Sequence, residues 1–226
     1  MTGRAEGATV LAERRAAARA GAALVERGMR VGLGSGRTVS LLIRELGRRS
    51  REGLRFRCVA ASVESAALAR GEGLSLEELS PRGLDLALDG ADEVDPAGRL
   101  LKGGGGALTR ERIVLAAARR RVVLVDSEKL VPRLGTRRRL PVEVLPFGAP
   151  RTRALVADML GTATWRRRSG ALFVTDNGGW VLDAPLPRLR DLALLQRSLD
   201  GLPGVVDCGL FLDLATEIVN GGRVSG

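Results

Sequence analysis

The chain has 226 residues, of which 45% are apolar, and it carries a formal net charge of +10. This length suits one large domain or one domain carrying a smaller one, and it allows a core that folds without disulfide or metal staples. Histidine and tyrosine are absent. Every mechanism with an imidazole base is therefore excluded, and a general base must be a carboxylate, a lysine or a thiolate.

The positive charge is spread along the chain rather than gathered in one segment. Arginine runs are short and well separated, at 119–121, 137–139 and 166–168, and aromatic residues make up 3% of the chain. So few aromatics provide no platform for base stacking, and we interpret the arginines as solvated helix faces and loops rather than as a nucleic-acid surface. A positive field can still attract small anionic substrates.

The sequence predicts a cytoplasmic protein without a membrane segment. No apolar run approaches the roughly 20 residues that span a bilayer. Residues 1–7 lack the basic and then apolar layout of a signal peptide. Cys58 and Cys208 are far apart in apolar surroundings, which indicates two reduced thiols in the core.

Helical and strand-like segments alternate through the first part of the chain. The predicted helices are 8–28, 37–49, 63–70 and 108–120, and the predicted strands are 29–34, 54–62, 84–89, 99–102 and 121–126. This alternation is typical of an α/β fold with a doubly wound, mostly parallel, Rossmann-like sheet.

The rhythm changes after Gly135. The predicted strands are now 141–146, 162–168, 171–175, 180–184 and 205–212, and the predicted helices are 150–160 and 188–199. This is close to the β-α-β-β-α-β order of a ferredoxin-like domain, with one extra strand. We therefore predict a Rossmann-like domain at 1–135 plus 211–226, with a smaller α+β domain inserted at 136–210.

A glycine-rich turn, VGLGSGRT at 31–38, joins the first predicted strand to the second helix. Glycines expose backbone amides, and a helix N-terminus favours an anion, so the turn can cradle a phosphate. A plain strand-to-helix turn is the alternative. The third glycine of a dinucleotide fingerprint and the lysine of a P-loop are both missing.

An acidic segment, DGADEVD at 89–95, follows the strand 84–89 directly. Carboxylates at the carboxyl end of a parallel strand lie where open α/β sheets bind ligands, and they can hold sugar hydroxyls. A solvated acidic turn and a divalent metal site are the alternatives. The spacing does not match a calcium-binding EF-hand loop, and we predict no metal.

A third segment, KGGGGALTRE at 102–111, begins with a lysine and four glycines. The glycines let a ligand approach the backbone, whose amides can stabilise an oxyanion. Glu111 falls in the first turn of the next helix, where it can be a base or merely complement the helix dipole.

Only two of the 36 basic residues are lysines, Lys102 and Lys129. Lys102 opens the glycine run, and Lys129 follows the strand that ends at Asp126. An ammonium is a compact charge with rotatable donors, unlike the planar guanidinium. Retention of lysine at these two places indicates a function.

These segments carry a resemblance to a known family. VGLGSGRT, DGADEVD, KGGGGALTRE, VDSEK, LPVEVLPFG, TDNGG and PGVVDCGLF occur in the order seen in A-type ribose-5-phosphate isomerases, over about residues 12–212. The resemblance implies an aldose–ketose isomerase that acts on a sugar phosphate without cofactor or metal, as a homodimer or homotetramer. A sugar-phosphate sensor and an enzyme acting on another sugar phosphate are the rival interpretations.

The resemblance also implies roles for individual residues. The phosphate and sugar loop falls on Ser35, Gly36, Arg37 and Thr38, the acidic loop on Asp89, Gly90, Ala91 and Asp92, and the glycine loop on Lys102, Gly103, Gly104 and Gly105. Glu111 matches the general base and Lys129 a binding lysine; Lys102, Asp89 and Asp92 assist catalysis. Arg37 departs from the small hydroxyl residue usual in the family, and Arg14 and Arg15 stand where a lysine pair is frequent.

Overall fold

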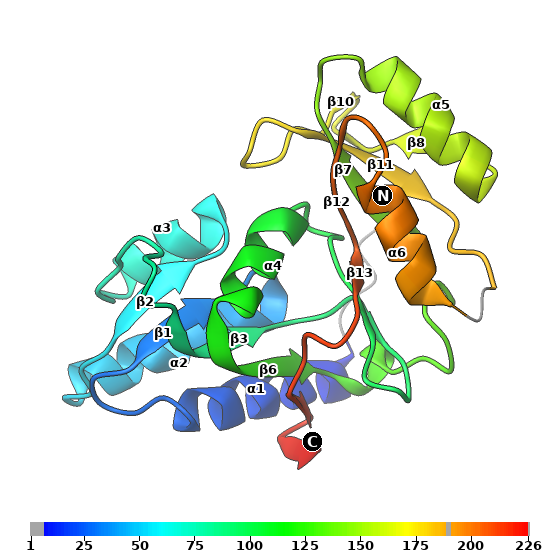
Figure 1. Ribbon diagram of the computed structural model, residues 1–226. Helices are drawn as coiled ribbons and strands as arrows, with labels where there is room; N and C mark the ends of the chain where they lie inside the picture. Colours follow the sequence, from blue (N-terminus) through cyan, green and yellow to red (C-terminus); the bar gives the residue numbers. More distant parts are fainter. Residues whose placement is uncertain (1–6, 189–190, 226) are drawn as a thin grey trace. The chain divides into compact units, whose positions relative to one another are not determined.

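The computed structural model describes residues 7–188 and 191–225. These residues fall into two compact units (Figure 1). Unit 1 is formed by the described parts of Met1–Ala91, Ile113–Leu130 and Leu214–Gly226, and unit 2 by those of Asp92–Arg112 and Val131–Asp213.

Unit 1 contains a six-stranded, mostly parallel sheet. In chain order its strands are β1 (Arg30–Leu33), β2 (Arg57–Ala60), β3 (Leu84–Asp89), β6 (Ala118–Val125), β14 (Glu217–Asn220) and β15 (Arg223–Ser225). Their order across the sheet is β15-β14-β6-β3-β1-β2, and every neighbouring pair is parallel except β14 and β15. The prediction of a Rossmann-like α/β fold is confirmed.

Helices cover both faces of this sheet. The helices α1 (Ala8–Ala23) and α2 (Arg37–Arg51) bury one apolar side each, in a cluster with Val31 and Leu33 of β1 (Figure 1). Because side chains alternate along a strand, Gly32 faces the other way. A Cβ on Gly32 would lie 2.4 Å from a methyl group of Val114, so this glycine lets α4 (Leu108–Ala116) approach the opposite face.

Two short elements complete unit 1. The helix α3 (Val63–Gly71) packs against α2 and β2, and Ser62 caps its N-terminus. A single 3₁₀ turn, η1 (Ser127–Lys129), follows β6 and is capped by Asp126. Glu13 of α1 accepts hydrogen bonds from the amide and hydroxyl of Ser127, which ties this turn to the first helix.

Unit 2 contains the predicted ferredoxin-like arrangement. Its four-stranded antiparallel sheet has the order β12-β7-β11-β8. The strands are β7 (Leu140–Val144), β8 (Thr164–Trp165), β11 (Trp180–Ala184) and β12 (Val205–Cys208), and the helices are α5 (Ala149–Leu160) and α6 (Leu192–Asp200). A small hairpin, β9 (Arg167–Arg168) with β10 (Ala171–Leu172), lies between β8 and β11 in the chain.

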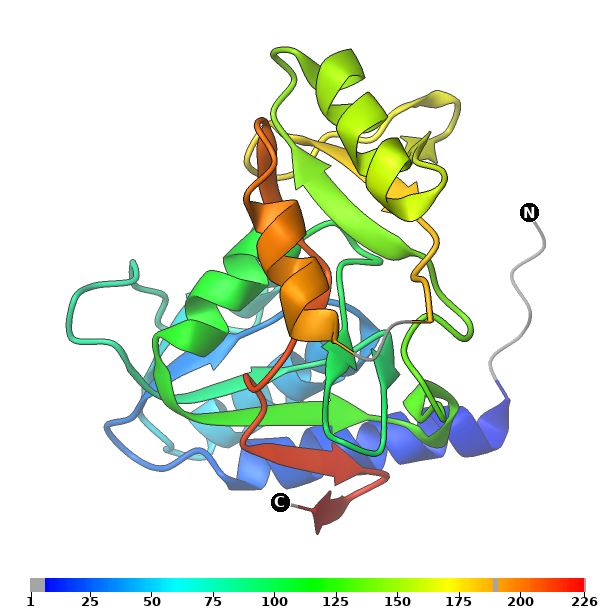
Figure 2. The same cartoon turned by 45° about the vertical axis from the view of Figure 1, so that its right-hand side comes forward.

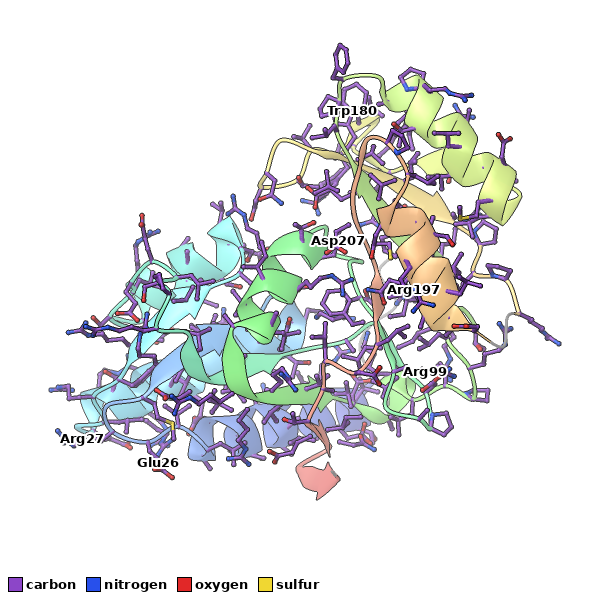
Figure 3. The ribbon with its side chains drawn as sticks, in the orientation of Figure 1. Glu26, Arg27, Arg99, Trp180, Arg197 and Asp207 are labelled. Atoms are coloured by element: carbon purple, nitrogen blue, oxygen red, sulfur yellow. The ribbon has the colours of Figure 1, made fainter. Side chains whose placement is uncertain are left out.

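The two faces of this four-stranded sheet differ in chemistry. Leu140, Val142 and Val144 of β7 share an apolar cluster with α5 and α6, which lie together in Figure 2. By strand alternation, Glu143 belongs to the other face. Trp180, labelled in Figure 3, meets Trp165 edge to face with ring centroids 5.6 Å apart.

A second, three-stranded antiparallel sheet in unit 2 is formed by β4 (Glu93–Val94), β5 (Leu100–Leu101) and β13 (Leu210–Phe211). The strand predicted at 205–212 is therefore two strands in two sheets. The break falls at Gly209, whose amide donates to the Pro141 carbonyl and whose carbonyl accepts from the Lys102 amide. Because β4 and β5 pair with β13, unit 2 includes residues 92–112, and its bounds differ from the predicted insertion at 136–210.

Two predicted helices end earlier than expected. The first ends at Ala23 rather than Gly28, because Gly28 has φ +86° and its amide donates to the Arg55 carbonyl in the turn before β1. The helix predicted at 108–120 ends at Ala116, because Ala118 already pairs with Leu84 in the parallel sheet. The composition of residues 117–120 also suits a helix, but pairing with β3 makes Ala118 and the residues after it a strand.

Further boundaries differ in unit 2. The strand predicted at 162–168 is divided into β8 and β9, and the one at 171–175 is reduced to β10. The helix predicted at 188–199 begins at Leu192, with Asp191 accepting from the Leu194 amide as its N-cap. Residues 189–190 of that prediction lie outside the described residues.

Both cysteines are buried free thiols. Burial raises the pKa of Cys58 and of Cys208 to about 12, so both are protonated at neutral pH and neither is an activated nucleophile. Within the part of the chain that the structure describes, no helix is long and apolar enough to cross a membrane.

A buried ion pair joins the first helix to the end of β6. Arg14 Nε lies 2.6 Å from Asp126 Oδ2, and the two side chains are 3% and 0% exposed. We predict that Arg14→Ala lowers the free energy of unfolding by about 3–5 kcal/mol, because it leaves a buried carboxylate without its charge partner. Arg15→Ala, at the exposed neighbouring position, should change it by about 0.5 kcal/mol or less. Urea unfolding followed by circular dichroism measures both, and equal effects would contradict the prediction.

Candidate active site

The carboxyl ends of three parallel strands lie along one edge of the sheet in unit 1. Leu33 of β1 is in register with Leu88 of β3, and Asp89 is in register with Val123 of β6. The segments that follow these strands therefore start side by side. They contain the predicted residues 35–38, 89–91 and 129, at the edge where open α/β sheets bind ligands.

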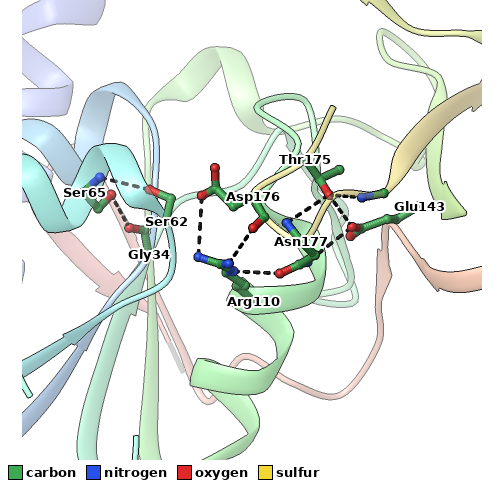
Figure 4. A network of polar contacts seen from close by, with 9 residues as sticks. Gly34, Ser62, Ser65, Arg110, Glu143, Thr175, Asp176 and Asn177 are labelled. Carbon is green, nitrogen blue, oxygen red and sulfur yellow. Dashed lines mark hydrogen bonds and ion pairs between the residues drawn. The ribbon is translucent and has the colours of Figure 1, made fainter. Parts of the chain in front are cut away.

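The glycine-rich turn after β1 is held by hydrogen bonds to the backbone of Gly34. Gly34 donates its amide to the Leu88 carbonyl at 2.9 Å, and its own carbonyl accepts from the Ser65 hydroxyl at 2.7 Å (Figure 4). Gly36 has φ +89° and stands at the N-cap of α2, a conformation that glycine adopts without strain.

The helix α2 then begins with Arg37, which is exposed, and Thr38, which is buried. Ser35 is half-buried at the turn itself. A helix N-terminus that follows an open glycine turn presents backbone amides to an anion. The predicted phosphate cradle thus lies at a glycine turn that leads into a helix N-terminus, and its Arg37 is exposed.

Asp89 is turned toward this glycine-rich turn. It is 1% exposed, and its Oδ1 accepts from the Ser35 amide at 3.2 Å and from the Gly90 amide at 2.7 Å. A Cβ on Gly34 would lie 1.9 Å from the same oxygen. Asp89, the last residue of β3, therefore also fixes the glycine-rich turn. The next residues, Gly90 and Ala91, are half-buried.

Lys129 ends the 3₁₀ turn η1 and is half-buried. Its amide donates to the Asp126 carbonyl at 3.0 Å. The carboxylate of Asp126 is engaged by Arg14 and by the Glu128 amide. The buried pair described above therefore holds the segment on which Lys129 stands.

Unit 2 brings together a lysine and a carboxylate that are both buried. Lys102 Nζ lies 3.2 Å from Glu111 Oε2, with side-chain exposures of 3% and 5%. Lys102 directly follows β5, and its amide donates to the Gly209 carbonyl. Its ammonium stands 5.6 Å from the centre of the Phe211 ring, so one side of the pair is apolar.

The neighbours of Glu111 on α4 are each tied to another element of unit 2. Thr109 donates to the carboxylate of Glu143. Arg110 donates to Asn177 Oδ1 at 2.7 Å and to the Asp176 carbonyl at 2.6 Å, as Figure 4 shows. Glu143 also accepts from the Thr175 hydroxyl at 2.6 Å and the Asn177 amide group at 3.2 Å.

On the other side of Glu111, Arg112 Nε lies 2.8 Å from both carboxylate oxygens of Asp207, which Figure 3 labels. Its Nη2 donates to the carbonyls of Cys208 and Leu210. The first turn of α4 is thus fixed before and after Glu111, while Glu111 itself turns to Lys102.

The glycine loop after Lys102 contacts a second predicted carboxylate. Gly104 donates its amide to Asp92 Oδ2 at 2.7 Å, and Gly105 is exposed. The amide of Gly104 therefore already has a hydrogen-bond acceptor. The prediction that the loop amides face an oxyanion then concerns the other amides of the loop. The carbonyls of Gly103 and Gly104 both accept from Arg166 Nη1, at 2.6 and 3.2 Å.

Among the described residues, one group has the composition of a metal site: Asp200, Asp207 and Cys208. Asp207 is already engaged by Arg112 on both oxygens, and the raised pKa of the Cys208 thiol keeps it protonated. Burial also raises the pKa of Asp207, and Arg112 partly offsets this. A protonated thiol does not bind metal, so the group is a poor site.

The predicted residues thus fall into two sets. Unit 1 holds Ser35, Gly36, Arg37, Thr38, Asp89, Gly90, Ala91 and Lys129, and unit 2 holds Asp92, Lys102, Gly103, Gly104, Gly105 and Glu111. Sequence reasoning missed Glu143 and Arg166. Glu143 lies in the quoted LPVEVLPFG segment, where a carboxylate within an apolar strand was the available signal. Arg166 stood in a run interpreted as solvated, and nothing in its sequence context distinguishes it.

Comparison with known proteins gives a consistent result. The sequence profile of "Ribose 5-phosphate isomerase A (phosphoriboisomerase A)" matches residues 57–224. Ribose-5-phosphate isomerase A of Thermomicrobium roseum is 48% identical over 208 residues, which are 91% of this chain and 88% of the relative.

Solved structures agree. Ribose 5-phosphate isomerase A of Methanocaldococcus jannaschii has a TM-score of 0.88 at 36% identity, covering 94% of this chain and 96% of that one. A D-ribose-5-phosphate isomerase solved in complex with phospho-erythronic acid has a TM-score of 0.90 at 33% identity, covering 96% and 97%. With these matches spanning nearly its whole length, the chain is an isomerase that belongs to the ribose 5-phosphate isomerase A family.

Proposed function

We propose that the protein interconverts D-ribose 5-phosphate and D-ribulose 5-phosphate through an enediolate, with Glu111 as the general base, in the non-oxidative pentose phosphate pathway. The observation that carries the proposal is the buried pair of Lys102 and Glu111, 3.2 Å apart. With no histidine in the chain, a carboxylate in a low-exposure position is the group suited to move a carbon-bound proton.

In the proposed reaction Glu111 removes the proton from C2 of the open-chain aldose. The electron pair of that bond forms the C1–C2 double bond, and the carbonyl oxygen on C1 becomes an oxyanion. Lys102 and the exposed end of the glycine loop stabilise that charge. Return of the proton to C1, with transfer of the O2 hydroxyl proton to O1, gives the ketose, so no cofactor is consumed.

The remaining residues bind the substrate in this proposal. The turn of Ser35, Gly36, Arg37 and Thr38, together with Lys129, takes the phosphate, because amides at a helix N-terminus and a flexible ammonium both suit a dianion. Asp89 and Asp92 hold sugar hydroxyls, and one of them assists ring opening. Each of these carboxylates already orders a glycine-rich loop by accepting a hydrogen bond from a backbone amide, so both are held in place before a substrate binds.

A relative supports the substrate class. The isomerase at 33% identity was solved with phospho-erythronic acid, a phosphorylated sugar acid. The carboxylate of such a compound resembles the planar, charged enediolate, so a site built for that intermediate would bind it. We also propose a cytoplasmic homodimer or homotetramer, and light scattering after size-exclusion chromatography measures the assembly.

Glu111→Gln separates the proposed base from a residue that only complements a helix dipole. The amide keeps the size of the side chain but cannot take a proton, so kcat should fall by at least about 100-fold. Binding of ribose 5-phosphate should stay within about tenfold, since other residues hold the phosphate and hydroxyls. Exchange of the C2 proton with solvent deuterium should fall together with kcat.

Glu64→Gln is the matched control, because Glu64 also lies in the first turn of a helix, α3, and is exposed. It should alter stability by about 1 kcal/mol or less and leave turnover unchanged. Near-normal isomerisation by Glu111→Gln would remove Glu111 from the mechanism.

Lys102→Arg tests whether charge alone is sufficient at this position. The guanidinium is larger and its donors lie in a fixed plane, and Lys102 is enclosed between Glu111 and Phe211. The charge beside the oxyanion should be misplaced, so kcat should fall on the order of 100-fold or more. Steady-state kinetics measures the change, and wild-type turnover would show that any cation serves.

Metal removal tests the prediction that the acidic segment is not a metal site. Activity should survive dialysis against excess EDTA, because the proposed proton transfer and charge stabilisation use side chains and amides alone. Loss of turnover that magnesium or manganese restores would mean that Asp89 and Asp92 bind a metal ion and that the proposed mechanism is wrong.

A further inference from the structure

Arg166 differs from the two arginines that follow it. It lies between β8 and β9 and is half-buried, whereas Arg167 and Arg168 are exposed. Its backbone is fixed on both sides, because its amide donates to the Val181 carbonyl and its carbonyl accepts from the Phe173 amide. Its side chain therefore starts from an ordered segment of unit 2.

The guanidinium of Arg166 joins a carboxylate to the glycine loop. Its Nε lies 3.0 Å from Asp183 Oδ2 and its Nη2 lies 2.5 Å from Asp183 Oδ1. The third nitrogen, Nη1, donates to the Gly103 carbonyl at 2.6 Å and to the Gly104 carbonyl at 3.2 Å. Asp183 holds the fork side-on, so the direction of Nη1 is set before it meets the loop.

These contacts fix the orientation of two successive peptide planes. In a trans peptide the carbonyl and the amide of the next residue point in opposite directions, and the described chain has no cis peptide. The carbonyl of Gly103 points to Arg166, and the amide of Gly104 accordingly points away and reaches Asp92 Oδ2. By the same geometry the Gly104 carbonyl, held by Arg166, directs the Gly105 amide away from the guanidinium.

We propose that Arg166 is a positioning residue that orients the Gly104–Gly105 peptide, so that the Gly105 amide is the glycine-loop donor to the oxyanion of the reaction. This inference rests on the proposed function and assigns the oxyanion contact to one amide. A cation hydrogen-bonded to the carbonyl of a peptide also polarises it and strengthens its N–H as a donor. Arg166 acts only through the loop.

The chemistry of arginine suits this task better than that of lysine. Arg166 makes four hydrogen bonds, two to the Asp183 carboxylate and two to the glycine loop. The rigid, planar guanidinium can make both sets at once, whereas an ammonium can bind either the carboxylate or the loop with correct geometry. A loop with four consecutive glycines has little conformational preference of its own. Its orientation is therefore set by contacts: the Gly106 amide donates to the Gly103 carbonyl at 3.0 Å, and Arg166 holds the carbonyls of Gly103 and Gly104.

The test uses Arg166→Met, with Arg167→Met as the matched control. Arg167 is exposed, and its Nη1 donates to the carbonyl of the nearby Gly170 at 2.8 Å. For Arg166→Met we expect kcat to fall on the order of 100-fold, as for loss of an oxyanion donor. KM should stay within about threefold, because ground-state binding is unchanged. Arg167→Met should retain the kinetics of the original protein.

Two further measurements separate positioning from a merely structural role. Millimolar guanidinium should raise the kcat of Arg166→Ala by at least about tenfold, whereas ammonium should not. Only the planar guanidinium can bind both Asp183 and the glycine loop. Asp183→Asn keeps the shape of the partner but loosens the fork, so it should lower kcat and leave KM unchanged. If the Arg166 variants fail to fold, the kcat of Asp183→Asn tests the positioning role instead.

A lowered melting temperature with full kcat in folded Arg166→Met, or full kcat in Asp183→Asn, overturns the inference. Lys102→Arg and Glu111→Gln are measured alongside. If they lose turnover while Arg166→Met keeps it, the positioning role fails and the proposed function stands. If they also keep full turnover, the proposed function itself fails.

Discussion

Three glycines leave no room for a side chain beside the charged residues of the candidate site. A Cβ would lie 1.9 Å from Asp89 Oδ1 at Gly34, 2.7 Å from Asp92 Oδ1 at Gly104, and 2.3 Å from the Lys102 carbonyl oxygen at Gly209. Any larger residue at these places would displace a carboxylate or the backbone that carries the lysine. The positions of the charged groups therefore depend on backbone that approaches them closely, and both units share this constraint.

The same close approach explains how far the sequence alone could reach. Apolar strands such as 84–89 alternate with helices in a pattern that indicates a parallel sheet. As expected, DGAD and the glycine turn lie at the carboxyl ends of neighbouring strands of this sheet. A sequence pattern does not state, however, which group a carboxylate contacts. Asp89 and Asp92 each bind a backbone amide of a glycine-rich loop, a long-range contact that their local sequence cannot indicate.

The sequence did not predict some element boundaries or the contacts of Arg166, for a related reason. Ala118 and the residues after it suit a helix locally, but pairing with Leu84 places them in β6. Arg166, Arg167 and Arg168 are identical in type, and only the tertiary position of Asp183 and the glycine loop distinguishes the first. The position of lysine was more informative, because Lys102 is one of two lysines in a chain that uses arginine elsewhere, as in the bidentate pair of Arg120 with Glu217.

The sheet of unit 1 has a consequence for the synthesis of the chain. Its strand β6 is complete at Val125, but the strand that pairs with its outer edge, β14, begins at Glu217, near the end of the sequence. During translation the backbone groups along this edge of β6 have no strand partner until residues 217–220 are made. An open edge next to buried valines and leucines can pair with another chain. A product that ends before β14 would therefore carry a self-association surface that β14 covers in the folded protein.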